Sequence, residues 1–274
     1  MGSDLLRITV LGSATPFPRP GNACSGYLVE GGGVRLWVDA GTGTLAELQR
    51  HVTLGEVDAI WISHLHADHS ADLLTAYYAL LYAGLDLPLP VPLFGPPGIA
   101  DRLAGFLSNG PDRSPVEKAF AVEELYDGHV VRIGGLALRS RAVEHGGLPA
   151  FALRVEDAGG AAGASLVYSG DCEPCPSLVE LALECDLFVC EADGCVPGHH
   201  SAAQAGRSAA EARAGRLVVT HVGPGTTPAD AVALAAAEFP GDVVHADPGA
   251  RFEAVVTRRS RTPGRTTTSP ASSR

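Results

Sequence analysis

Residues 61–74, WISHLHADHSADLL, place three histidines and two aspartates within nine positions, directly behind a run of strand-forming residues. Imidazole nitrogens and carboxylate oxygens are the ligands that zinc and neighbouring divalent ions take in proteins. Because one ion cannot conveniently use four such side chains within a six-residue loop, the spacing favours two ions a short distance apart. The four side chains have the spacing HxHxDH where a predicted strand gives way to a predicted helix: His64, His66, Asp68 and His69.

Three further ligand-type residues stand at the carboxyl ends of predicted strands elsewhere in the chain. His145 follows LALRSRAVE, Asp171 ends SLVYSGD, and His221 follows RLVVT. Open α/β sheets place their sites at this end of their strands. A single histidine after a strand is most often a surface or capping residue, but chance rarely spaces an HxHxDH motif behind an apolar strand. Together, the motif and the three strand-end residues predict a metal site.

Apolar patterning predicts strands and helices in both halves of the chain. Strands that first dominate and then alternate with helices suit stacked mixed sheets with helices outside, a four-layer α/β arrangement. Since no linker interrupts residues 1–257, we expect them to form one domain. Strands are expected at 6–12, 25–33, 34–39, 57–64, 90–98, 118–125, 129–144, 150–156, 165–169, 186–192, 216–223, 242–246 and 251–256. Helices are expected at 44–52, 70–84, 98–108, 201–215 and 227–239.

The charge distribution limits the classes of partner. The net charge is −11, but residues 258–274 hold five arginines and no acid, which leaves 15 basic and 31 acidic residues before them, a net charge of −16. A folded region this acidic is poorly suited to binding the phosphate backbone of a nucleic acid. The terminal segment is rich in Ser, Thr, Pro and Arg and is predicted to be disordered, with contact to nucleic acid as the less favoured alternative.

Neither a membrane span nor a secretory signal is expected, because the chain has no run of 18 apolar residues and no basic region followed by an apolar core at its start. These features favour a cytoplasmic protein with reduced thiols. Cys172 and Cys175 have CxxC spacing, but no second CxxC completes a four-sulfur zinc site, so a redox or structural-metal role is less favoured. The sequence contains six cysteines: Cys24, Cys172, Cys175, Cys185, Cys190 and Cys195.

The segment SHLHADH, with the three later ligand-type residues, resembles the metallo-β-lactamase superfamily, whose fold is an αββα sandwich. The flanking segments LGSATPFPRPGNACSGYLV, WVDAGTGTLAEL and LVVTHVGP resemble, more narrowly, the branch that contains ribonuclease Z and related phosphodiesterases. Zinc is the default ion for such ligands, with manganese or iron as alternatives. The resemblance implies that one metal is bound by His64, His66 and His145, the second by Asp68, His69 and His221, and that Asp171 bridges the two.

The same resemblance suggests the catalytic residues. Asp68 would hold a metal and also orient the nucleophile or take its proton. His200, in the HHS loop at 199–201, is the expected general acid, with His199 less favoured. In ribonuclease Z-like proteins a His-Glu-Ala-Thr-type loop precedes this position, whereas this sequence reads CEAD, so Cys190 replaces the histidine. Glu191 remains to orient His200, and a purely structural role for it is an equal alternative.

Supporting and non-ligand residues can also be suggested. Asp39 and Thr220 are candidates for orienting the imidazoles, since each ligand histidine needs a partner for its second nitrogen. For Asp39 a simple turn or cap role is an equal alternative. His51, His129 and His245 are not expected to bind metal.

Only 25 residues separate His145 from Asp171, and they are predicted to form a hairpin. Long forms of ribonuclease Z carry a basic arm for transfer RNA in this interval, and here there is no room for one. We therefore expect a phosphodiesterase in which metal-bound hydroxide attacks a small or cyclic phosphodiester. Hydrolysis of a thioester, lactone or other acyl ester is the alternative, followed by ribonuclease Z-type RNA 3′ processing and a non-catalytic binding protein. A homodimer is an option, because members of the family often dimerise.

The helix that follows the metal loop could select the substrate. Tyr78 and Tyr82, with Tyr77 beside them, could line a pocket over the metals, where an aromatic group would stack. Their helical spacing is equally typical of core packing, so both interpretations stay open at this stage.

Overall fold

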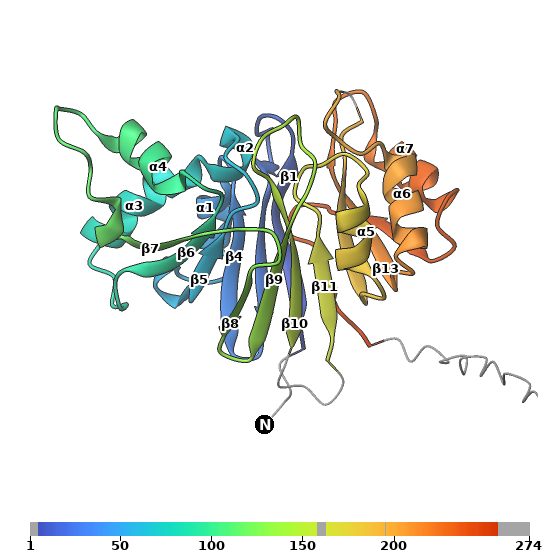
Figure 1. The fold of residues 1–274 in the computed structure, drawn as a ribbon, viewed down its shortest axis with the longest axis horizontal. Coiled ribbons are helices and arrows are strands. Elements are labelled where there is room, and N and C mark those ends of the chain that lie inside the picture. Colours follow the sequence, from blue (N-terminus) through green and yellow to red (C-terminus); the bar gives the residue numbers. More distant parts are fainter. Residues whose placement is uncertain (1–4, 158–162, 195, 257–274) are drawn as a thin grey trace, which may run out of the picture.

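The computed structural model describes residues 5–157, 163–194 and 196–256, which form two β-sheets packed face to face (Figure 1). In the first sheet the strand order is β15-β1-β3-β4-β5-β6-β7, and the short β2 pairs with β1. Strands β4, β5, β6 and β7 are parallel neighbours, so their carboxyl ends lie at one edge. The strands are β1 (Arg7–Ala14), β2 (Ala23–Cys24), β3 (Gly26–Gly31), β4 (Val34–Ala40), β5 (Ala59–Trp61), β6 (Val91–Gly95), β7 (Phe120–Glu124) and β15 (Arg251–Glu253).

The second sheet has the order β14-β13-β12-β11-β10-β9-β8. Strands β8 to β11 pair antiparallel, whereas β11 to β14 are parallel and connect through helices. Its strands are β8 (Val130–Ile133), β9 (Leu136–Ala142), β10 (Phe151–Asp157), β11 (Ser165–Tyr168), β12 (Leu187–Ala192), β13 (Arg216–Val222) and β14 (Asp242–His245).

Helices cover the outer face of each sheet, α1 to α4 on the first and α5 to α7 on the second (Figure 1). This arrangement confirms the expected four-layer αββα sandwich. No helix in the described part of the chain is both long and apolar enough to cross a membrane. The helices are α1 (Thr44–Leu48), α2 (Ala67–Ser70), α3 (Asp72–Tyr82), α4 (Ile99–Leu107), α5 (Pro176–Ala182), α6 (Ala202–Glu211) and α7 (Pro228–Ala236), with 3-10 turns at Leu54–Glu56 and Val116–Lys118.

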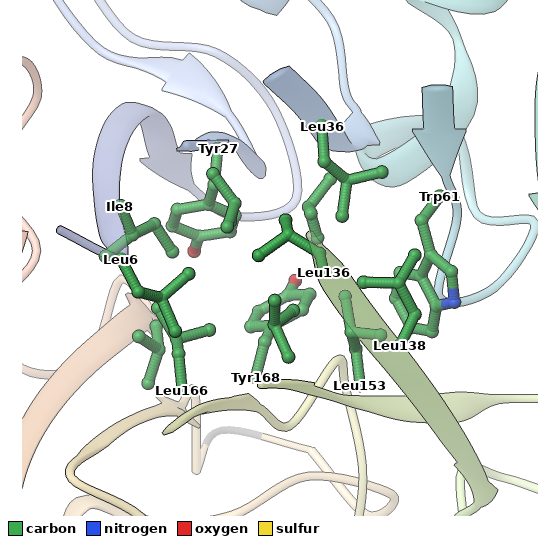
Figure 2. Packing of buried hydrophobic residues seen from close by; sticks show 14 of the residues in the cluster. Leu6, Ile8, Tyr27, Leu36, Trp61, Leu136, Leu138, Leu153, Leu166 and Tyr168 are labelled. Carbon is green, nitrogen blue, oxygen red and sulfur yellow. The ribbon is translucent and has the colours of Figure 1, made fainter. Parts of the chain in front are cut away.

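Central strands are apolar on both faces because each sheet is buried on both sides. On β3, Tyr27 and Val29 point into the core between the sheets, while Leu28 points to the helices. On β11, Tyr168 points between the sheets and Val167 points to the other helix layer. Figure 2 shows side chains of both sheets meeting in the central core, among them Tyr27 and Tyr168. The alternation follows from the two-residue period of a strand.

Buried polar contacts join the sheets inside this apolar core. The hydroxyl of Tyr27 on β3 lies 2.6 Å from the hydroxyl of Thr220 on β13. The indole nitrogen of Trp61 on β5 donates to Ser140 on β9 at 3.1 Å. Buried polar groups that find partners in this way fix how one sheet sits on the other.

Most expected elements are present, and the differences have local causes. The strand expected at 129–144 is a hairpin of β8 and β9, turned at Gly134 and Gly135. Gly134 has a φ of 51°, and a Cβ at Gly135 would lie 2.8 Å from Gly32, so both positions require glycine. Helix α5 was not expected, although Pro176 at its first position and the spacing of its apolar residues indicate it.

Two expectations concern residues outside the described range. The tail at 258–274 and Cys195 lie there, so the predicted disorder and the one-domain boundary at 257 stay predictions. The other five cysteines are buried and free.

We expect Leu153→Ala to lower the free energy of unfolding by about 2–5 kcal/mol, because it opens a cavity between the two sheets. Leu153 on β10 is fully buried in the central core. Leu234→Ala is the matched control, since Leu234 on α7 is 50% exposed and should cost less than about 0.5 kcal/mol. Urea unfolding followed by circular dichroism measures both variants. Similar midpoints for the two would contradict the packing described here.

Candidate metal centre

The HxHxDH motif lies in the connection from β5 to α2. His64 follows the buried end of β5, His66 is the N-cap residue of α2, and Asp68 and His69 lie within that helix. His64 and His69 are fully buried and Asp68 is nearly so. A strand that ends and turns at once into a helix brings side chains from both elements to one point.

The other ligand-type residues come from the second sheet. His145 follows β9, Asp171 follows β11, and His221 lies near the end of β13. All three are buried. His221 has a φ of 49°, an unusual backbone conformation for a non-glycine residue. The predicted convergence of strand ends is therefore present in the fold.

Three imidazoles form the first group of the site. The Nε2 atom of His64 lies 3.0 Å from Nδ1 of His66, and Nε2 of His145 lies 3.2 Å from the same atom. Each of the three rings thus directs one nitrogen to a common point. A carboxylate oxygen of Asp171 lies 3.8 Å from the nitrogen of His64.

The second group contains Asp68, His69 and His221. The Nε2 atoms of His69 and His221 are 3.3 Å apart, and Oδ2 of Asp68 is 3.4 Å from that of His221. Oδ2 of Asp171 lies 3.3 Å from both of these nitrogens. Asp171 therefore stands between the two groups. The structure brings together all of the predicted ligand residues, hereafter the ligand cluster: His64, His66, Asp68, His69, His145, Asp171 and His221.

The electrostatics of the cluster suit divalent cations. Burial and the neighbouring His69 hold the pKa of His64 well below its usual range, so this ring is neutral and can donate a lone pair. Burial alone would also lower the pKa of His69, but Asp171 and Asp39 raise it well above its usual range. The carboxylates thus favour positive charge at this point, which a metal ion can supply. Oδ1 of Asp171 is buried without a hydrogen-bond partner, as expected of an atom that would coordinate a metal.

Asp39, at the end of β4, orients part of the cluster. Its Oδ2 accepts from Nδ1 of His69 at 2.7 Å, and its carboxylate also accepts from the amide and the hydroxyl of Ser63 and from Tyr168. Because Nδ1 of His69 is thereby held as a donor, Nε2 is the nitrogen that faces the cluster. The other candidate for such a role, Thr220, hydrogen-bonds Tyr27 instead.

The ring of His145 is fixed by a contact that the sequence analysis missed. Its Nδ1 lies 2.9 Å from the backbone carbonyl of Gly198, in the loop before α6. A backbone carbonyl partner carries no sequence signal, because every residue has one.

His200, expected as the general acid, does not face the ligand cluster. Its ring is fully buried, with Nδ1 2.6 Å from the carbonyl of Cys172 and Nε2 3.1 Å from the hydroxyl of Ser208 on α6. Burial lowers the pKa of His200 to about 4. A neutral ring with both nitrogens engaged cannot deliver a proton to a substrate, so this geometry contradicts the expected role.

His199 takes the place expected for His200. Its Nδ1 lies 3.0 Å from Oε1 of Glu191 and 3.8 Å from Oδ2 of Asp171. Burial opposes a charge on this ring, but the contact with Glu191 outweighs it and raises the pKa of His199 to about 9. Glu191 is fully buried and is held by the backbone amides of Cys172 and Asp193. Glu191 therefore orients a histidine, but His199 rather than His200.

A hollow of about 490 Å³ opens over the ligand cluster. Its walls combine cluster residues with apolar ones and contain neither lysine nor arginine. Tyr78 and Tyr82 are not part of them: both are exposed on α3, at 47% and 73%, while Tyr77 is buried in the core. These tyrosines therefore do not line the hollow over the ligand cluster, as had been considered from the sequence. The lining residues are Thr15, Pro16, His66, Ala67, Asp68, Asp171, Asp193, Val196, His199, His221 and Pro224.

We expect Asp39→Asn to weaken metal binding about 10–100-fold, because the amide no longer provides the anionic acceptor that orients His69. Asparagine tolerates the φ of 55° at this position, so the backbone should be kept. Competition with a chromophoric chelator measures the affinity. Asp247→Asn, at an exposed carboxylate, is the control and should bind metal as the wild type does. Equal affinities in all three proteins would show that Asp39 has no part in the site.

Comparison with known proteins agrees with this fold and site. The model of the beta-lactamase superfamily domain matches residues 10–222. An uncharacterised protein of Mycobacterium leprae is 37% identical over 256 residues, covering 90% of this chain and 88% of its own length. Ribonuclease Z of Mycobacterium marinum is 32% identical over 282 residues, covering 87% of this chain and 95% of that enzyme.

Among solved structures, the metallo-β-lactamase fold protein YhfI of Bacillus subtilis superposes with a TM-score of 0.78 at 25% identity. The superposition covers 90% of this chain and 99% of YhfI. These likenesses span both sheets and every segment that supplies the ligand cluster. The chain therefore belongs to the metallo-β-lactamase superfamily and is a hydrolase of the branch that contains ribonuclease Z and related phosphodiesterases.

Proposed function

We propose that this hydrolase is a phosphodiesterase that acts on a small or cyclic phosphodiester with two divalent ions, zinc by default. The observation that carries the proposal is the ligand cluster, in which Oδ2 of Asp171 stands between two groups of ligand atoms below a hollow open to solvent. Ions bound there would generate hydroxide at neutral pH and neutralise charge on the phosphoryl group. The likeness to ribonuclease Z, at 32% identity, supports a phosphorus centre over a carbonyl carbon.

The charge of the hollow supports a small substrate. Its lining residues include no lysine or arginine, so it offers neither of these side chains to the further phosphates of a nucleic acid. Apolar walls at Pro16, Val196 and Pro224 suit an uncharged group attached to a single phosphodiester. The interval between His145 and Asp171 holds the hairpin of β10 and β11, which is too short for a protruding RNA-binding arm.

Two side chains beside the cluster would carry out the two proton transfers, one at the nucleophile and one at the leaving group. Asp68 lines the hollow and lies next to His221, so its carboxylate can orient the attacking nucleophile and accept its proton. His199 also lines the hollow; Glu191 engages Nδ1 and leaves Nε2 to protonate the departing alkoxide. Fixed donors and acceptors of this kind require little reorganisation when charge develops in the transition state.

A substrate panel tests the proposal directly. Zinc-loaded protein is assayed on bis(p-nitrophenyl) phosphate, on 3′,5′- and 2′,3′-cyclic nucleotides, on an acyl thioester and on a transfer RNA precursor. We expect the highest kcat/KM on a phosphodiester from the first two groups. Preference for the thioester would contradict phosphodiester cleavage, and specific 3′ cleavage of the precursor would contradict the argument from charge and size.

We expect His199→Ala to lower kcat about 10²–10⁴-fold on an alkyl phosphodiester, whose alkoxide leaves with a proton. On bis(p-nitrophenyl) phosphate the loss should be much smaller, because p-nitrophenolate departs without one. His51→Ala is the control, since His51 contacts Arg251 and belongs neither to the lining of the hollow nor to the ligand cluster. Equal losses on the two substrates would contradict proton donation by His199.

A further inference from the structure

We propose that Cys172 and Cys175 are an oxidisable dithiol, and that a disulfide between them moves Asp171 and loosens the metal site. The disulfide itself is independent of the proposed function; only its effect on hydrolysis rests on that proposal. The CxxC motif of the sequence has no role in the ligand cluster or in the contacts that orient it.

Cys172 connects several parts of the site through its backbone. It follows Asp171 directly, its amide donates to Glu191 at 2.9 Å, and its carbonyl lies 2.6 Å from Nδ1 of His200. The next residue, Glu173, donates its amide to the carbonyl of Glu144, immediately before His145. A displacement of this short segment would therefore reach two residues of the ligand cluster and the carboxylate that orients His199.

Cys175 is 7% exposed and Cys172 is fully buried, so Cys175 is the member of the pair that is nearer to solvent. It is the N-cap residue of α5 and lines a surface hollow of about 430 Å³, together with Pro174, Gln204 and Arg207. Its sulfur lies 3.4 Å from the hydroxyl of Ser177. The hydrogen bond with Cys172, opposed by burial and supported by Ser177, lowers the pKa of Cys175 to about 5. Thiolate character and access to solvent are the two properties that make a cysteine sensitive to peroxide.

The two cysteines are separated by only two residues and are buried in the same apolar cluster, so no distant chain segment has to unfold to join them. In the reaction, the thiolate of Cys175 attacks one oxygen of hydrogen peroxide, forming a sulfenic acid, and the released hydroxide takes a proton to become water. The thiol of Cys172 then attacks the sulfur of Cys175, and the sulfenic oxygen leaves with protons as a second water. Two thiols are oxidised and one peroxide is reduced.

Formation of the disulfide alters the geometry next to the metal ligands. To form the disulfide, the sulfurs must approach to about 2 Å, with a fixed dihedral angle. Cys175 is anchored by helix α5, whereas Cys172 lies in the loop that carries Asp171. The loop is therefore the part that moves, and with it the carboxylate between the two groups of ligand atoms.

A second metal site at these sulfurs is less consistent with the structure. Among the described residues, no grouping of three ligand-type side chains with converging donor atoms contains a cysteine. His200, which lies 3.8 Å from the sulfur of Cys172, has both ring nitrogens engaged elsewhere.

The test treats the metal-loaded full chain with hydrogen peroxide and analyses it by mass spectrometry under non-reducing conditions. We expect a loss of two hydrogens in the peptide that holds both cysteines, a metal affinity about 10–100-fold lower by chelator competition, and recovery of both with dithiothreitol. Cys175→Ser should bind metal normally and resist peroxide, because serine keeps the N-cap but cannot form the bond. Cys185→Ser, at a buried cysteine outside the pair, should respond as the wild type does.

Each contrary result overturns a defined part of the proposal. Stable sulfinic acid at Cys175, or oxidation without a link to Cys172, would contradict the dithiol. A disulfide that leaves metal affinity unchanged would contradict the coupling to Asp171. Neither readout requires turnover, so a protein that fails to cleave phosphodiesters but shows the disulfide and the affinity change would contradict the proposed function alone.

Discussion

The hydrogen bond from Tyr168 to Asp39 joins the two sheets directly behind the ligand cluster, and the site depends on it. Asp39 ends a strand of the first sheet and Tyr168 ends a strand of the second. The same carboxylate holds His69 and the backbone of Ser63, so the packing of the sandwich and the direction of the ligand rings are set by one buried group. The pair of Tyr27 and Thr220 forms a second link, one strand away in the first sheet and two strands away in the second. A fold whose halves could slide would not keep ligands from both sheets within a few ångströms.

Burying this many ionisable groups is costly unless a compensating charge is present. In the cluster, two carboxylates approach histidine rings from both sheets, and burial alone disfavours every charged form. Asp171 is nevertheless held ionised: burial opposes this, but His221 and His69 keep its pKa well below the usual range. Two divalent ions would offset the carboxylates and use the ring nitrogens as lone-pair donors, which explains why so polar a cluster is tolerated inside an apolar sandwich.

The sequence could predict the part of the site that depends on residue type and strand ends. His64, His145 and Asp171 were found because ligand-type side chains behind apolar strands must meet at one edge of the sheets. The choice between His199 and His200 could not be made this way, because adjacent side chains point in different directions and the loop decides which one faces the cluster. The wall at Val196 and Pro224 was missed for a similar reason, since apolar loop residues have no chemical signature.

The secondary structure likewise contains elements that the local sequence predicts and elements that depend on contacts between distant segments. Period-two apolar runs predicted the central strands, because each is buried on both faces. The break at Gly134 and Gly135 lay inside a run that otherwise read as one strand, and it depends on a close backbone approach to Gly32 from the other sheet. Helix α5 is short and packs through few residues, so its pattern was weak. Local rules thus predicted the layers, and contacts between distant segments set the details.

The central proposal is that Asp171 would hold two divalent ions together. Metal content of wild type and Asp171→Asn, measured by inductively coupled plasma mass spectrometry after dialysis against limiting zinc, tests it most directly. The account predicts about two ions per wild-type chain and one or fewer in the variant, with the fold unchanged by circular dichroism. Two tightly held ions in the variant, or none in the wild type, would contradict it.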